Sequence, residues 1–122
     1  MPKTSVVFFK DERGMVPVLQ WLDRLPDIIE AKALVRIEEL AQYGHEMRRP
    51  HAAYLRDGIY ELRWKHQSVN YRILYFFRGR SAVILSHGLT KEDVVPPREI
   101  ERAIKNKILC ESNPHLYVYE GA

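Results

Sequence analysis

Alternating apolar and polar residues predict a three-stranded antiparallel meander in the middle of the chain. In Ile59–Lys65 every second residue from Tyr60 onward is apolar and the residues between are charged, which is the period of a half-buried strand. Asn70–Phe77 places four aromatic or aliphatic residues on one face. Ser81–Leu89 is the most apolar of the three segments, which favours the centre of the sheet. Arg78-Gly79-Arg80 supplies the tight turn between the last two strands.

Helical periodicity predicts a helical hairpin before this meander. Val16–Arg24 fits a short helix, because Pro17 is acceptable in a first turn. Ile28–Tyr43 has apolar residues at nearly helical spacing. Asp27 is the expected cap of this second helix, and Gly44 is its natural stop.

Three further elements complete the pattern. Val6–Lys10 is rich in β-branched and aromatic residues and predicts a strand. Ala52–Leu55 predicts a second, shorter strand just before the meander. Pro96 and Pro97 open a last helix over residues 97–108.

Strands and helices segregated in this order indicate an α+β fold: a small antiparallel sheet with an N-terminal helical hairpin and a C-terminal helix. The 122 residues fit one domain, which we assign to residues 1–108. Residues 109–122 are expected to form an irregular or weakly extended tail. Within it, residues 116–119 can add an edge strand.

Composition points to a cytoplasmic protein without a membrane anchor. No apolar run approaches the roughly 18 residues that span a bilayer. The first residues become charged too early for a signal peptide. Cys110 is the only cysteine, which excludes an internal disulfide framework of the kind that small secreted domains use.

Positive charge is concentrated in the meander. The net charge is +3, but residues 59–92 hold six basic and two acidic residues, whereas residues 1–58 are balanced and residues 93–122 have a slight acidic excess. Such a concentration can attract a polyanion. The alternative is solvated sheet charge that prevents strand edges from pairing with other chains.

Several kinds of chemistry have no counterpart in the sequence. There is no Gly-rich phosphate loop, and the five histidines do not show zinc-ligand spacing. No nucleophile elbow is present, although a nucleophilic triad assembled from distant residues stays open. We expect no metal and no cofactor.

The residues that remain are arginine, lysine, histidine and tyrosine on strands, and these suit metal-free cleavage of RNA. There the 2′-hydroxyl attacks the adjacent phosphorus, so the protein must align the backbone and neutralise charge on the phosphate oxygens. Arginine binds phosphate through two parallel hydrogen bonds, and lysine acts as a point charge. An exposed aromatic ring can stack on an unpaired base.

Four short blocks resemble the HigB-type toxins of the RelE/ParE superfamily, in their phage-derived-protein-like branch. The blocks are Leu55–Arg63, Tyr71–Phe77, His87–Lys91 and Pro97–Ala103. The resemblance covers about residues 5–108 and implies the same α+β architecture. It also implies ribosome-dependent cleavage of messenger RNA, and a partner antitoxin that is often a helix-turn-helix protein.

The resemblance places the site on the meander. Arg63 and Arg72 would contact phosphate or stabilise the transition state, and His87 and Lys91 would close the site from the last strand. The other candidates are Lys65, His66, Arg78 and Arg80 as RNA-backbone contacts, and Tyr71, Tyr75 and Glu92 as further members of the site. For Arg72 the alternative is an ion pair with Glu61 or Glu92 across the sheet, and for the two tyrosines it is a place in the core.

The chain departs from the family pattern at two positions. Lys91-Glu92 stands where two lysines are common, and Leu89 stands where phenylalanine is common. Glu92 removes one positive charge from the expected site, or it acts there as a base. Two other functions therefore stay open: a non-catalytic, ParE-like protein that inhibits DNA gyrase, and an inactive family member.

Overall fold

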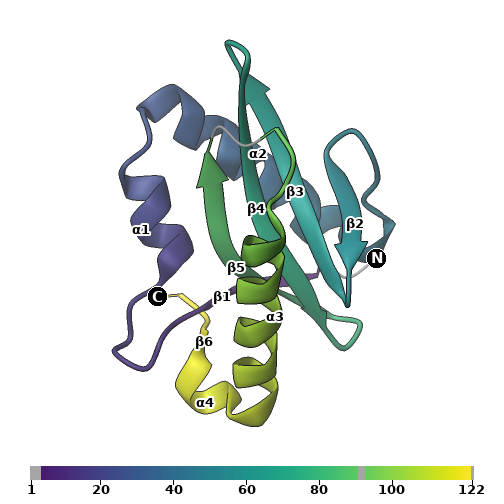
Figure 1. Cartoon of the computed structure of the whole chain (residues 1–122). Coiled ribbons are helices and arrows are strands. Elements are labelled where there is room, and N and C mark those ends of the chain that lie inside the picture. Colours follow the sequence, from purple (N-terminus) through teal and green to yellow (C-terminus); the bar gives the residue numbers. More distant parts are fainter. Residues whose placement is uncertain (1–3, 91–92, 122) are drawn as a thin grey trace.

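Six strands form one sheet in the computed structural model, which describes residues 4–90 and 93–121 (Figure 1). Their order across the sheet is β2-β3-β4-β5-β1-β6. The strands are β1 (Ser5–Phe9), β2 (Ala52–Arg56), β3 (Ile59–His66), β4 (Val69–Arg78), β5 (Ala82–Thr90) and β6 (Val118–Tyr119). The helices are α1 (Pro17–Asp23), α2 (Asp27–Tyr43), the 3₁₀ turn η1 (Gly44–Glu46), α3 (Pro97–Ser112) and α4 (Pro114–Tyr117).

The predicted α+β fold is confirmed. β2, β3, β4 and β5 pair antiparallel in chain order, as short turns between consecutive strands require. β1 lies parallel to β5 on the far side. No helix within the described residues is long and apolar enough to cross a membrane.

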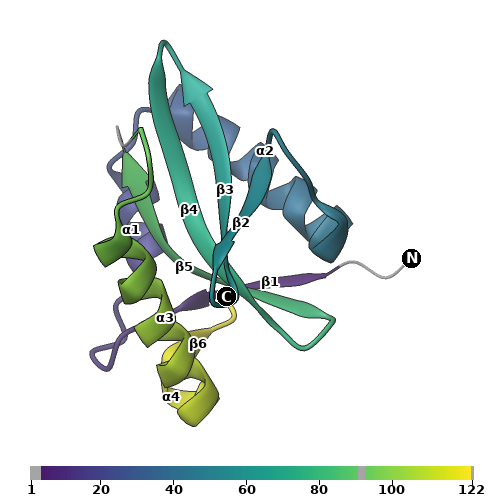
Figure 2. The same ribbon diagram turned by 45° about the vertical axis from the view of Figure 1, so that its right-hand side comes forward.

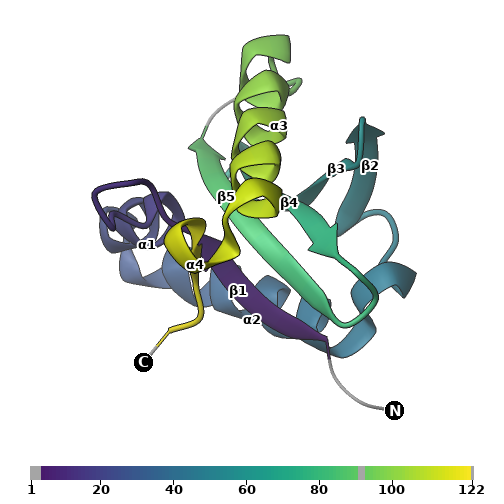
Figure 3. The same ribbon diagram turned by 90° about the horizontal axis from the view of Figure 1, so that it is seen from below.

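Helices cover both faces of the sheet, so the sheet separates two apolar cores. α1 and α2 lie on one face and α3 on the other (Figures 2 and 3). Tyr71, Ile73 and Tyr75 of β4 face α1 and α2, whereas Leu74 and Phe76 of the same strand face α3. This is the alternation predicted for β4, and it places Arg72 on the α3 face.

The C-terminal region differs from the irregular tail expected from residue 109. α3 runs to Ser112, because its buried stripe continues through Ala103, Asn106 and Cys110 at helical spacing. α4 follows, and β6 pairs with Phe8 and Phe9 of β1. The edge strand foreseen within residues 116–119 thus forms over two residues.

The start of α2 also differs from the expectation. Pro26 takes the N-cap position and no side chain caps the helix, so Asp27 is the first helical residue instead of the cap. A proline fixes the extended backbone that precedes a first turn. Asp27 and Glu30 lie in that turn, where negative charge favours the helix dipole.

A β-bulge in β5 changes which residues face each core. Leu74 pairs with His87 but Tyr75 pairs with Leu85, so Ser86 is the additional residue. Beyond the bulge, His87 faces α3. Gly88 lies against the ring of Trp21 in α1. Because of the bulge, the residues of β5 that follow Ser86 face the opposite side of the sheet from the one that simple alternation predicts. His87, an expected catalytic residue, is among them.

Candidate functional site

β2 is shorter than β3, and this difference leaves part of one strand edge uncovered. The β2–β3 ladder ends at the pair Ala52–Leu62, and the backbone N–H of Arg63 still donates to the carbonyl oxygen of His51 (2.9 Å). From Trp64 to His66, β3 pairs only with β4 among the described strands. α2 lies beside this segment, and Nε of Arg36 donates a hydrogen bond to the carbonyl oxygen of Arg63 (3.3 Å). The open edge is therefore flanked by a helix that carries its own cation.

A pocket of about 400 Å³ forms at this edge, and we call it the arginine pocket. It is lined by Arg36, Pro50, His51, Arg63, Trp64, Lys65, Asn70, Arg72 and Asp93. Four of these residues are cationic and one is acidic. With a mouth of this charge, the pocket favours an anionic ligand.

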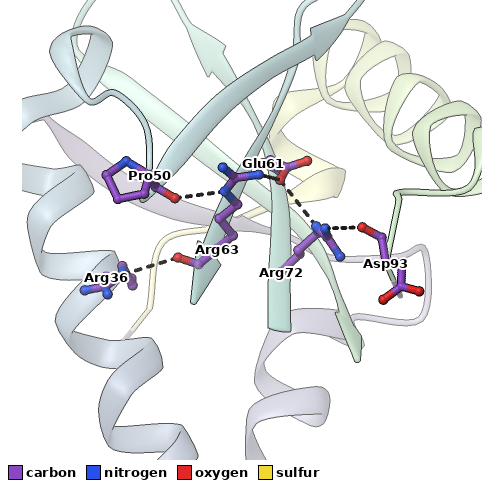
Figure 4. Close-up of polar contacts among 6 residues, drawn as sticks. All are labelled: Arg36, Pro50, Glu61, Arg63, Arg72 and Asp93. Atoms are coloured by element: carbon purple, nitrogen blue, oxygen red, sulfur yellow. Dashed lines mark hydrogen bonds and ion pairs between the residues drawn. The ribbon is translucent and has the colours of Figure 1, made fainter. Parts of the chain in front are cut away.

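Arg63 and Arg72 occupy directly opposed positions on β3 and β4. Their side chains converge on Glu61, as Figure 4 shows. Nη1 of Arg63 and Nε of Arg72 each lie 3.3 Å from Oε1 of Glu61. The Glu61 side chain is only 5% exposed, so a buried carboxylate fixes both guanidinium groups before any ligand arrives.

Backbone carbonyls hold the outer sides of both arginines. Nε of Arg63 donates to the carbonyl oxygen of Pro50 (2.8 Å), and Nη2 of Arg72 donates to that of Asp93 (2.8 Å). The Arg63 side chain is 31% exposed and that of Arg72 is 8% exposed. Nη2 of Arg63 makes no hydrogen bond to a described residue, so it can donate to a ligand in the pocket.

The structure brings some of the expected site residues together and separates others. Lys65 lines the arginine pocket with Arg63 and Arg72. Nδ1 of His66, at the end of β3, lies 2.9 Å from Nζ of Lys32. Lys91 and Glu92 lie outside the described residues.

Arg78 and Arg80 belong to the opposite end of the β4–β5 hairpin. Arg78 is six residues from Arg72 along β4, which corresponds to about 20 Å in a strand. Both side chains are exposed. They therefore do not share the arginine pocket, and contact with RNA backbone at that end stays a prediction.

Tyr71 and Tyr75 face away from the arginines. Both are buried on the α1–α2 face of β4. Burial raises the pKa of the Tyr75 phenol well above its ordinary value. Tyr71 stacks on Trp64, with 5.9 Å between ring centroids. Their positions are those of core aromatics.

His87 lies in a buried chain of hydrogen bonds beneath α3. Nδ2 of Asn106 donates to Oγ of Ser86 (2.9 Å). The hydroxyl of Ser86 is 2.8 Å from Nδ1 of His87, and Nε2 of His87 is 3.0 Å from Oε1 of Glu99. The Ser86 hydroxyl and the His87 ring each have a matching partner if the imidazole is neutral and carries its proton on Nε2.

This hydrogen-bonded series places a serine, a histidine and a glutamate in contact, but its serine and histidine are too deeply buried for a substrate to reach them. Ser86 is fully buried and His87 is 1% exposed. Burial, with a smaller contribution from the charge of Arg102, lowers the pKa of His87 to about 3. The nearby carboxylate of Glu99 favours the protonated ring and so opposes this decrease in the pKa of His87. The loss of hydration is the larger effect for a side chain buried this deeply. The geometry ties β5 to α3 and does not bring His87 to the arginine pocket.

We predict that His87 makes the protein less stable in mild acid. A histidine whose pKa falls on folding stays neutral in the native state while the unfolded chain takes up a proton below about pH 6.5, so stability falls as the pH decreases. Between pH 6.5 and pH 5 this contribution is about 1.5 kcal/mol. Urea unfolding at both pH values should show a smaller loss for His87→Gln than for the parent.

The matched control for this measurement is His115→Gln, because His115 is exposed. Its stability should follow the parent's pH dependence. Equal pH dependence in His87→Gln and the parent would contradict a neutral, buried His87.

Three charged or titratable residues that line the arginine pocket were not among those expected from the sequence. Arg36 belongs to a helix outside the basic meander, and His51 and Asp93 lie in connections. Nδ1 of His51 is 3.3 Å from Oε1 of Glu39. No local motif marks these residues, because they meet the meander only through packing of α2 and of the segment before α3. Among the described residues, no three His, Cys, Asp or Glu side chains are grouped to hold a metal ion.

Comparison with known families gives a match that spans the blocks of the meander. The family model described as "Phage derived protein Gp49-like (DUF891)" matches residues 20–107. The match includes α2, strands β2 to β5 and most of α3, so it contains both converging arginines. No curated protein matches the chain. Since most of its length fits this model, the chain belongs to the Gp49-like family of phage-derived proteins, within the RelE/HigB-type group of toxins.

Proposed function

We propose that this protein is the toxin of a type II toxin–antitoxin system, of the HigB kind, and that it cleaves messenger RNA on the ribosome without a metal ion. One observation carries the proposal: Arg63 and Arg72 converge from neighbouring strands on one carboxylate oxygen beside the arginine pocket. Two fixed guanidinium groups suit a phosphodiester whose oxygens gain charge during the reaction.

The chemistry requires the protein to stabilise one pentacoordinate phosphorus. The 2′-oxygen of the RNA forms a bond to the adjacent phosphorus while the bond from phosphorus to the 5′-oxygen breaks. The products are a 2′,3′-cyclic phosphate and a 5′-hydroxyl. Arg63 and Arg72 would neutralise the non-bridging oxygens. Because Glu61 already positions both side chains, little reorganisation accompanies the development of charge.

Proton transfer fits His51 better than His87. His51 lines the arginine pocket and its side chain is 37% exposed, whereas His87 is sealed beneath α3. Glu39 contacts Nδ1 of His51, which leaves Nε2 to accept the proton of the 2′-hydroxyl. Solvent can supply the proton that the departing 5′-oxygen takes up.

The protein would act in the cytoplasm with two kinds of partner. Membership of a toxin family implies an antitoxin in general, and we propose a helix-turn-helix protein. The substrate would be messenger RNA in the ribosome. Lys65, beside the arginine pocket, would contact the RNA backbone.

Cleavage in a purified translation mixture tests this function. We expect discrete new RNA ends by primer extension only when ribosomes are present, with a cyclic phosphate on the upstream product. A 2′-deoxy substitution at the cleaved nucleotide should abolish cleavage, because it removes the nucleophile. His51→Gln should slow cleavage by about 100-fold, and the exposed control His115→Gln should not.

The same mixture separates the alternatives. Intact transcripts, together with DNA damage in cells that express the protein, would favour a gyrase-binding relative and refute the nuclease. Intact transcripts without any growth defect would indicate an inactive family member. Cleavage that survives the 2′-deoxy substitution would refute the proposed chemistry.

A further inference from the structure

A second pocket, of about 490 Å³, adjoins the first across the segment that enters β2. We call it the tyrosine pocket; it is lined by His45, Met47, Arg48, Arg49, Ala52, Ala53, Tyr54 and Tyr60. None of these residues is acidic. Two arginines, a histidine and two tyrosines therefore form a cationic, aromatic hollow that the proposed catalytic chemistry does not use.

The aromatic side chains of this pocket are fixed in place. Tyr60 stacks on Tyr75 with 5.4 Å between centroids and 17° between planes, so its ring is anchored to the core. Tyr54 meets Tyr60 edge to face at 5.0 Å, and its hydroxyl accepts a hydrogen bond from the backbone N–H of Gly58 (3.1 Å). Tyr54 is nevertheless 56% exposed. An exposed ring that is already immobilised loses little entropy when a flat ligand stacks on it.

The two arginines have different tasks. Nη1 of Arg48 donates to the carbonyl oxygens of His45 (2.7 Å) and Met47 (3.2 Å), so Arg48 holds the loop. Arg49 is exposed and makes no hydrogen bond or ion pair with another described residue. Its guanidinium group is thus available to an anion beside the aromatic surface. A ring and a cation placed together suit a nucleotide, which has a flat base and a phosphate.

The chain itself connects the two pockets. Arg49 and Ala52 line the tyrosine pocket, while Pro50 and His51, between them in sequence, line the arginine pocket. One single-stranded RNA can therefore cross the loop at Pro50 with consecutive nucleotides in the two pockets. A base pair would not fit this arrangement, because stacking on Tyr54 requires an unpaired base.

We propose that the tyrosine pocket binds the unpaired base of the nucleotide next to the cleaved bond, with its phosphate on Arg49. This inference rests on the proposed function, because it assumes that the reactive phosphate lies in the arginine pocket. It assigns to Tyr54 a role in substrate binding, and the pocket shape would discriminate among bases at that position.

Crosslinking on programmed ribosomes tests the occupant. The messenger RNA carries a 2′-O-methyl group at the cleaved nucleotide, which prevents cleavage, and 4-thiouridine at successive positions around it. We expect thiouridine at one flanking position to crosslink to the peptide of residues 52–60, and thiouridine at the cleaved position to residues near Arg63 and Arg72. Tyr54→Ala should remove the first crosslink and weaken messenger RNA binding about ten-fold. Tyr54→Phe, which keeps the ring, should retain both.

The possible failures are distinguishable. If messenger RNA crosslinks near Arg63 and Arg72, but Tyr54→Ala and Arg49→Ala bind it as tightly as the parent, the subsite is refuted and the nuclease stands. If no messenger RNA crosslinks and no cleavage occurs, the proposed function fails together with the subsite. If Tyr54→Ala impairs only binding of the antitoxin, the pocket belongs to a protein partner and the inference is overturned. Thermal unfolding of each variant verifies that it is folded.

Discussion

Replacing Arg72 with alanine should abolish both growth arrest and messenger RNA cleavage. Arg72 is buried against Glu61 and anchored by the carbonyl oxygen of Asp93, so its guanidinium group is held in one place before any ligand binds. Loss of one preorganised donor costs about 100- to 1000-fold in rate. The rate of cleavage in the purified translation mixture and colony formation after induction measure the effect.

The matched variants separate catalysis from folding. Arg72→Ala leaves Glu61 paired with Arg63, and a buried carboxylate that loses one of its partners can destabilise the fold. Arg72→Lys keeps the charge but loses the planar fork that binds two oxygens, so we expect it to fold like the parent and to cleave much more slowly. Arg13→Ala, at an exposed loop position, should remain fully toxic. Undiminished toxicity of Arg72→Ala would refute the assignment.

Replacing Gly88 with alanine should destabilise the protein by about 3 kcal/mol or more. A methyl group on Gly88 would overlap the indole ring of Trp21. That ring cannot move aside easily, because its Nε1 donates to Oγ1 of Thr90 (3.0 Å) and because it packs against Trp64 in an edge-to-face arrangement. Denaturant unfolding monitored by tryptophan fluorescence measures the loss.

Gly79→Ala is the control for this substitution. Gly79 lies in the β4–β5 turn with φ of +64°, and a methyl group added there would meet no atom within 4 Å. Backbone strain alone should therefore cost about 1 kcal/mol. In a Trp21→Leu background, Gly88→Ala should cost less than in the parent, because the overlap has gone. Equal costs at Gly88 and Gly79 would contradict the packing argument.

The sequence contained the central part of the candidate site. Alternation placed Arg63 with Glu61 on one face of β3, and it placed Arg72 on the face of β4 opposite Tyr71 and Tyr75. The register that brings Arg63 and Arg72 together came from the structure. Pairing between Arg72 and Glu61 was open as an alternative to a functional role. In the structure Glu61 binds both arginines, so the ion pair and the proposed site consist of the same residues.

The pocket around these arginines could not be read from the sequence. Arg36 reaches it from α2, and His51 reaches it because the β2–β3 ladder stops at Ala52. Strand lengths and the packing of a helix against an edge depend on contacts among segments that are far apart in the chain. Periodicity describes one segment at a time and cannot show which neighbours close a cavity.

By itself, the sequence determined the α+β order and the meander, with Arg63 and Arg72 on neighbouring strands, because period-two alternation and turn residues act locally. The register that sets the two arginines opposite each other came from the structure. Only the tertiary structure decided the position of His87. A single additional residue, Ser86, inverts the alternation of β5, and this turns His87 beneath α3 and Gly88 toward Trp21. A bulge forms where a shifted register lets the side chains on both faces of the sheet pack better. Whether packing improves in this way depends on both cores, which exist only in the assembled tertiary structure.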